Sequence, residues 1–164
     1  MEHIKEEFEL LLLKDLCARA PYGVKIYLET PKYGELIGTL DAVYPTEGRV
    51  IVDNLDKAIA PFNVRCGGFK IEENKVKPYL RPMSNMTEEE KEEVSHLLPK
   101  DWSVEIDKLN NFYFDMCPSI FMEIDVFLNI IDWLNAHHFD YRGLIEKGLA
   151  IPEPAGMYDN EQNK

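Results

Sequence analysis

The chain has 164 residues, of which 45% are hydrophobic and 29% charged, and its formal net charge at pH 7 is −12. A chain of this length can build one ordinary hydrophobic core but not two large domains, and its apolar and aromatic content excludes an intrinsically disordered protein. The excess of carboxylates repels phosphate backbones and anionic membranes, so either kind of partner would need a locally basic face.

The cysteines and the first residues predict a cytoplasmic protein. Cys17, Cys66 and Cys117 are odd in number and widely spaced, which is typical of reduced, mostly buried thiols and not of a disulfide framework or a zinc site. The acidic residues before Leu10 do not resemble the basic leader of a signal peptide. The run Leu10–Leu13 is too short to span a membrane.

Residues 4–18 predict an amphipathic helix that ends at Pro21-Tyr-Gly23. Its apolar residues recur at helical spacing and are Ile4, Phe8, Leu11, Leu12 and Leu16. Asp15 belongs to the charged set expected on the opposite side. Leu10 and Leu13 widen the apolar face, which indicates either burial on two sides or contact with a partner.

Residues 24–76 alternate between apolar and polar side chains in short runs, as strands of a meander do. Three strands are expected around residues 24–28, 36–42 and 50–52, a weak one at 59–64, and one at 69–71 after Gly67-Gly68. Four or five short strands suit a small barrel. Pro78 and Pro82 are expected to prevent a long strand between them, so the barrel should close by Val76.

The second half begins with the strongest helix start in the chain. Thr87-Glu-Glu-Glu90 has the spacing of a capping box, and the helix should run to about Leu98. A hairpin is one alternative for residues 100–117. A second helix is predicted from Ser119, and a short helix from Asp140 to Lys147 that ends at a left-handed Gly148.

The second predicted helix has a clear apolar periodicity. Its expected core face consists of Ile120, Ile124, Phe127, Leu128, Ile131 and Leu134. Asp125, Asn129 and Asp132 lie on the opposite side. This helix should form the centre of a second core.

Charge divides the chain near residue 82. Residues 1–82 contain 12 Lys and Arg against 13 Asp and Glu, whereas residues 83–164 contain 6 against 17. The predicted organisation is therefore a helix plus small β-barrel at 1–82, an acidic and mainly helical part at 83–151 packed on the barrel, and a tail at 152–164 that is mobile unless Met157-Tyr158 docks.

Two charged stretches are candidate binding sites. The acidic one consists of Glu88, Glu89, Glu90, Glu92 and Glu93, and is either a solvated helix face or a surface for a basic protein. The basic one consists of Lys70, Lys75, Lys77, Tyr79 and Arg81, with Phe69 nearby. It is either a solvated edge strand or a strip that stacks bases and holds the phosphates of single-stranded nucleic acid.

No catalytic, nucleotide-binding or metal motif of useful specificity is present, and no cofactor is predicted. His137, His138 and Asp140 form the densest candidate group for a metal-dependent hydrolase. Adjacent histidines on a helix point about 100° apart, so a helix C-terminus followed by an Asp cap is the competing interpretation.

Two parts of the chain resemble known proteins. A helix followed by Val24-Lys-Ile-Tyr-Leu28 and Gly38-Thr-Leu40 resembles the opening of Sm-like and SH3-like small barrels, over residues 4–77. Asp41-Ala-Val-Tyr-Pro-Thr46 does not reproduce the Asp and Asn pair of the Sm-like RNA pocket. The resemblance implies an α+β fold with an N-terminal helix on a small SH3-like β-barrel.

The second half is similar to uncharacterised proteins of prophages and mobile elements in gut Bacteroidales. The likeness lies in Lys77-Pro-Tyr-Leu-Arg-Pro-Met-Ser-Asn-Met-Thr-Glu-Glu-Glu90 and in Asp132-Trp-Leu-Asn-Ala-His-His-Phe-Asp-Tyr-Arg-Gly-Leu-Ile-Glu-Lys-Gly-Leu149. It implies a cytoplasmic accessory protein of a mobile element. The sequence as a whole predicts non-catalytic binding to a protein with a basic surface, through the acidic half. The alternatives are single-stranded nucleic-acid binding by the barrel and a metal-dependent hydrolase.

Overall fold

The computed structural model describes residues 2–56, 68–99, 103–106, 112–115 and 124–158. The chain divides into two compact units, Met1–Leu80 with Leu144–Lys164 (unit 1) and Arg81–Gly143 (unit 2). The protein is α+β, as predicted, with an N-terminal helix, a six-stranded sheet and further helices. Among the described residues, no helix has both the length and the apolar composition needed to cross a bilayer.

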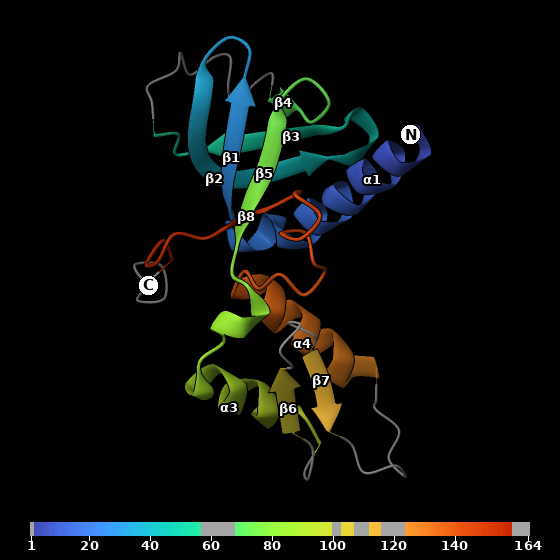
Figure 1. The fold of residues 1–164 in the computed structure, drawn as a ribbon, viewed down its shortest axis with the longest axis vertical. Helices are drawn as coiled ribbons and strands as arrows, with labels where there is room; N and C mark the ends of the chain where they lie inside the picture. Colours follow the sequence, from blue (N-terminus) through green and yellow to red (C-terminus); the bar gives the residue numbers. More distant parts are fainter. Residues whose placement is uncertain (1, 57–67, 100–102, 107–111, 116–123, 159–164) are drawn as a thin grey trace. The chain divides into compact units, whose positions relative to one another are not determined.

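Unit 1 is built on the six-stranded sheet, whose strands are labelled in Figure 1, with strand order β4-β3-β2-β1-β5-β8. Its strands are β1 (Lys25–Thr30), β2 (Gly34–Tyr44), β3 (Arg49–Asp53), β4 (Phe69–Lys70), β5 (Lys75–Leu80) and β8 (Ile151–Pro152). All neighbouring strands are antiparallel except β5 and β8, which are parallel. The expected meander is confirmed, while the weak strand expected at 59–64 lies outside the described residues.

Alternation along these strands sorts the side chains into a core face and a solvent face. In β1 the buried side chains are Ile26, Leu28 and Thr30, with partly exposed residues between them. The pairing of β2 with β3 shifts register between Leu40 and Ala42, which marks a bulge. Short 3-10 turns, η1 (Ala20–Tyr22) and η2 (Pro45–Glu47), lead into β1 and β3.

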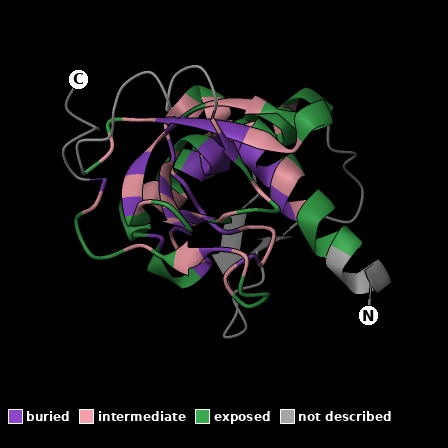
Figure 2. Cartoon of the chain, turned by 90° about the horizontal axis from the view of Figure 1, so that it is seen from above, coloured by how far each residue is buried: buried purple, intermediate pink, exposed green. Residues whose placement is uncertain are grey.

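Helix α1 (Glu2–Arg19) packs on this sheet through a stripe that differs from the predicted one. Leu12 and Leu16 join the core of unit 1, and Asp15 and Arg19 complete the buried stripe with their side chains paired at 2.7 Å. Asp15 was expected on the exposed side, and that prediction is wrong because Arg19 compensates its charge one turn later. Phe8 and Leu10 remain exposed, and Figure 2 shows the exposed residues gathered towards the N-terminal end of α1.

Strand β5 runs through Pro78, so the expectation that the prolines stop the strand at Val76 is wrong. Pro78 lies opposite Ile26 of β1, while β8 pairs only with Tyr79 and Leu80. At Pro78 the strand therefore has a neighbour on one side and an edge on the other. This is a position where a residue without an N–H is tolerated.

The segment from Leu144 to Tyr158 returns to the sheet of unit 1. The short helix expected at 140–147 is absent there, since residues 144–148 form turns closed by Leu149 N to Leu144 O at 2.9 Å. Gly148 does adopt the expected left-handed conformation, with φ +69°. Tyr158 is buried, donates its hydroxyl hydrogen to Tyr79 O at 2.8 Å, and accepts a hydrogen bond from Lys25 N at 3.0 Å.

Unit 2 contains the turn η3 (Met83–Asn85), helix α3 (Glu88–Leu97), the hairpin strands β6 (Ser103–Ile106) and β7 (Phe112–Asp115), and helix α4 (Ile124–Ala136). The hairpin confirms the alternative offered for residues 100–117. The core of this unit comprises Met83, Met86, Val94, Leu98, Ile130, Leu134 and Phe139. Figure 1 labels α3, β6, β7 and α4.

Helix α4 buries a different arc from the predicted one. Ile130 and Leu134 are buried, and Val126, Ile131 and Trp133 pack against the same core. Ile124, Phe127 and Leu128, which were expected to face the core, are exposed. The prediction is confirmed for Ile131 and Leu134, and Ile120 lies outside the described residues. It is wrong for the three exposed residues because an apolar arc of a helix is wider than the neighbouring elements that cover it.

Candidate binding surfaces

The acidic run lies on α3, and the local sequence fixes its first turn. The Thr87 hydroxyl accepts a hydrogen bond from Glu90 N at 3.2 Å, and the Glu90 carboxylate accepts one from Thr87 N at 2.9 Å. This capping box is the one predicted from the sequence. Glutamates in the first turn also face the positive end of the helix dipole.

Glu90 differs from the other glutamates of the run because it forms a nearly buried ion pair. Its carboxylate accepts hydrogen bonds from both terminal nitrogens of Arg81, at 2.5 and 2.9 Å, and each side chain is 13% exposed. Burial alone would raise the pKa of Glu90, but the hydrogen bonds from Arg81 and from the Thr87 amide outweigh it and lower that pKa. Glu90 is thus a structural residue of unit 2 and is not available to a partner.

Four glutamates of α3 remain at the surface, namely Glu88, Glu89, Glu92 and Glu93. Lys91 lies among them and binds Glu88 at 2.6 Å. Surface ion pairs of this kind contribute about 0–1 kcal/mol and exchange readily with other partners. The predicted acidic surface is therefore present on α3, with four glutamates instead of five.

Among the residues of unit 2 whose burial is described, the large exposed apolar side chains lie on α4, on a surface that the sequence interpretation assigned to the core. Ile124, Phe127 and Leu128 are 73%, 46% and 51% exposed. At 100° per residue they occupy one side of the helix, and Asp125 and Asp132, both exposed, occupy the adjoining side. We call these five residues the α4 stripe. No signal in the sequence separates the covered part of this apolar arc from the uncovered part.

The predicted basic strip is distributed over three places. Lys70 lies on β4, Lys75 and Lys77 lie on β5, and Arg81 belongs to unit 2. β4 and β5 are not paired with each other in the sheet, but the turn between them brings Asn74 N within 3.1 Å of Lys70 O, so Lys70 lies beside the start of β5.

Four of the five members of the basic strip interact with other groups of the protein. Tyr79 is buried, which raises its pKa, and its carbonyl accepts from Tyr158. Lys75 binds Glu29 at 2.7 Å and Lys70 binds Glu73 at 3.1 Å, which raises the pKa of Lys70. Arg81 pairs with Glu90 and lies over the Phe139 ring at 4.2 Å. The Tyr79 ring is therefore not exposed for stacking on a base.

The backbones of His138 and Asp140 hydrogen-bond to the backbone of Arg81. Arg81 N donates to His138 O at 2.9 Å and Asp140 N donates to Arg81 O at 2.8 Å. The His137 ring stacks on Trp133 with 3.9 Å between centroids, while His138 is buried with φ +60°. In the part of the chain that the structure describes, no group of three or more His, Cys, Asp or Glu side chains is arranged to hold a metal ion.

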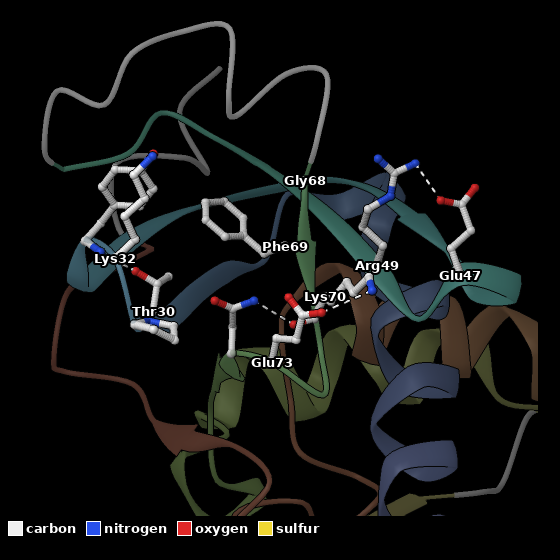
Figure 3. Close-up of a pocket in the computed structure, with 11 residues that line it drawn as sticks. Thr30, Lys32, Glu47, Arg49, Gly68, Phe69, Lys70 and Glu73 are labelled. Atoms are coloured by element: carbon white, nitrogen blue, oxygen red, sulfur yellow. Dashed lines mark hydrogen bonds and ion pairs between the residues drawn. The ribbon is translucent and has the colours of Figure 1, made fainter.

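Unit 1 contains a pocket of about 580 Å³ that sequence reasoning did not identify. It is lined by the turn between β1 and β2, the start of β3, strand β4 and the turn after it. Figure 3 shows the Phe69 ring between Lys32 and Arg49. The lining brings together three cations, Lys32, Arg49 and Lys70, from three segments that are far apart in the sequence.

No family model, curated protein or solved structure matches this chain. Conclusions about function therefore rest on the α4 stripe, the surface glutamates of α3 and the pocket of unit 1.

Proposed function

We propose that this chain is a non-catalytic binding protein, an accessory protein of a mobile element, that recognises a protein partner through unit 2. The observation that carries the proposal is the α4 stripe, in which exposed apolar side chains adjoin exposed carboxylates. The partner that fits such a stripe is an amphipathic segment with apolar residues beside Lys or Arg.

The apolar part of the stripe accounts for affinity. Fully burying a large apolar side chain contributes about 1.5–3 kcal/mol, so covering the exposed half of Phe127 or Leu128 contributes on the order of 1 kcal/mol each. Their i, i+3, i+4 spacing with Ile124 is the spacing by which one helix recognises another in a groove. Neighbouring exposed apolar side chains often mark a binding surface.

The carboxylates account for the choice of partner. Residues 81–143 contain 13 Asp and Glu against 5 Lys and Arg, so unit 2 carries most of the negative charge of the protein. Charges around an interface mainly raise the association rate and reject partners of the wrong sign. The surface glutamates of α3 would act in this way, whereas Glu90 would not, because Arg81 already neutralises it.

We also propose that unit 1 is the SH3-like small barrel that the resemblance implies. In unit 1 the first strand pairs with both the second and the fifth, and the order β4-β3-β2-β1-β5 follows. This connectivity, preceded by α1, supports an SH3-like small barrel for unit 1 and an acidic, mainly helical part beside it in the sequence.

The test uses two exposed leucines that differ in location only. Leu128 of the α4 stripe is 51% exposed, and Leu10 of α1 in unit 1 is 52% exposed. A fluorescent amphipathic helical peptide of Leu and Lys is titrated against the wild type, Leu128→Lys and Leu10→Lys. We expect Leu128→Lys to weaken binding roughly tenfold or more, because it removes an anchor and adds a like charge. Leu10→Lys should bind as the wild type does.

Two control peptides separate the apolar contribution to binding from the contribution of charge. A Leu and Glu peptide should not bind, and a Ser and Lys peptide should bind weakly and lose its binding at high salt. Equal affinity of all three protein variants for the Leu and Lys peptide would exclude the α4 stripe as the contact surface.

A further inference from the structure

The pocket of unit 1 carries an inference that is independent of the partner proposed for unit 2. We propose that it binds a small organic anion whose apolar body lies on Phe69 and whose anionic group is held by Lys32 and Lys70. The volume of about 580 Å³ is within the range of small-molecule sites, roughly 300–1,000 Å³.

The floor of the pocket is apolar and firmly held. Phe69 is only 7% exposed and pairs with Val50 across β3 and β4, and its neighbour Gly68 has φ +61°. A Cβ at Gly68 would lie 2.6 Å from Val50 O, so only glycine allows the two backbones to approach this closely. The backbone that carries the Phe69 ring is thereby held against β3.

The rim of the pocket carries a net positive charge in a protein of net charge −12. Arg49 is committed, since it binds Glu47 at 2.9 Å and lies over the Tyr44 ring at 4.6 Å. This leaves Lys32 and Lys70 as the cations that can turn towards a ligand.

Lys32 and Lys70 are both accessible. Among the described residues no carboxylate pairs with Lys32, whose ammonium lies 5.0 Å from the Tyr33 ring centroid. Lys70 does bind Glu73, but both side chains are more than half exposed, so the pair contributes little and can be exchanged for a ligand anion.

The turn that carries Glu73 is itself tied down beside the pocket. Asn74 donates from its side-chain amide to Lys70 O at 2.7 Å and from its backbone to the same oxygen at 3.1 Å. Lys70 therefore extends from a fixed backbone, and only its side chain has to move. Two accessible cations beside an apolar ring select a ligand with one anionic group and one apolar group.

The experiment is an NMR titration of the full ¹⁵N-labelled chain with four probes of similar size. Benzoate and phenyl phosphate carry the anion on a ring, benzyl alcohol is neutral and benzylamine is cationic. We expect saturable shifts of the amides of residues 30–34 and 68–74 with one or both anions, and the tighter anion identifies a carboxylate or a phosphate as the preferred group. The neutral and cationic probes should bind more weakly.

Substitution of Lys32 and Lys70 tests whether these two lysines bind the anion that causes the NMR shifts. In Lys32→Gln with Lys70→Gln, the affinity for the anion should fall roughly tenfold, because both charge contacts are removed. Lys91→Gln, which removes an equally charged residue from α3 in unit 2, should leave it unchanged. Equal shifts with all four probes, no saturable shift with either anion, or an unchanged affinity in the double variant would each overturn the proposal. Failure here leaves the function proposed for unit 2 unaffected, because no residue is shared.

Discussion

Glu90 shows how one residue in a run of like residues can have a different role from its neighbours. It closes the capping box with Thr87 and neutralises Arg81, whose guanidinium also covers the Phe139 ring. Three local interactions of unit 2 therefore depend on a single carboxylate. Glu93, only three residues away, is exposed.

The first prediction at this scale is a substitution pair. Glu90→Gln should lower the free energy of unfolding by about 1–3 kcal/mol, because Arg81 loses its charged partner. Glu93→Gln should change it by less than about 0.5 kcal/mol. Urea unfolding at neutral pH, followed by a probe in unit 2 such as Trp133 fluorescence, measures both. Equal effects of the two substitutions would mean that the ion pair contributes nothing.

Acid should remove the advantage of the wild type over Glu90→Gln. The pKa of Glu90 is lower in the folded protein than the usual value of about 4.3, so the folded state binds the proton less readily than the unfolded state does. The contribution of Glu90 is therefore present above about pH 4.3 and is lost as the pH falls through its folded pKa. The difference in stability between the two proteins should shrink accordingly, whereas a constant difference down to about pH 2 would contradict this cause.

At the scale of elements, two glycines outside the strands are needed for different physical reasons. Gly68 and Gly148 both have positive φ, +61° and +69°. A Cβ at Gly68 would meet Val50 O, whereas nothing lies within 4 Å of one at Gly148. Substitution of Gly148 therefore introduces backbone strain alone, whereas substitution of Gly68 introduces backbone strain and a steric clash.

Alanine at these two glycines gives the corresponding prediction. Gly148→Ala should cost about 1–2 kcal/mol for the left-handed conformation alone. Gly68→Ala should cost about 1–3 kcal/mol more, because β4 must also move away from β3. Thermal unfolding of both variants measures the difference, and equal losses would show that β3 and β4 can separate without cost.

Patterns within an element were readable from the sequence, and contacts between elements were not. The capping box, the alternation of β1 to β3 and the left-handed Gly148 follow from neighbours in sequence and were predicted. The burial of Asp15, the strand through Pro78 and the exposed α4 stripe depend on what packs alongside. Cys17 is exposed for the same reason, against the expectation of buried thiols, while Cys66 and Cys117 lie outside the described residues.

The candidate sites also differ in whether they lie within one element or are formed by several. The glutamates of α3 could be found from the sequence because they are consecutive on one helix. The pocket of unit 1 could not, because Lys32, Arg49 and Lys70 meet only through the pairing of β3 with β4 and the position of the β1 to β2 turn. The predicted basic strip consists of residues that are close in the sequence. The cations that line the pocket come from different strands and turns, which only the fold brings together.

At the scale of the whole molecule, the two units differ in the chemistry that they expose. Unit 2 combines an acidic helix with the α4 stripe, and unit 1 contains a cationic pocket on a sheet. A protein partner for the first and a small anion for the second are therefore separable functions. Substitutions in one unit should leave binding by the other intact.

The most direct test of the central claim is affinity capture of the tagged chain from a nuclease-treated lysate of its host, with bound proteins quantified for the wild type, Leu128→Lys and Leu10→Lys. The α4 stripe predicts that a basic protein is recovered with the wild type and Leu10→Lys, and lost with Leu128→Lys. Recovery of the same proteins with all three variants, or of nucleic acid alone from an untreated lysate, would contradict it.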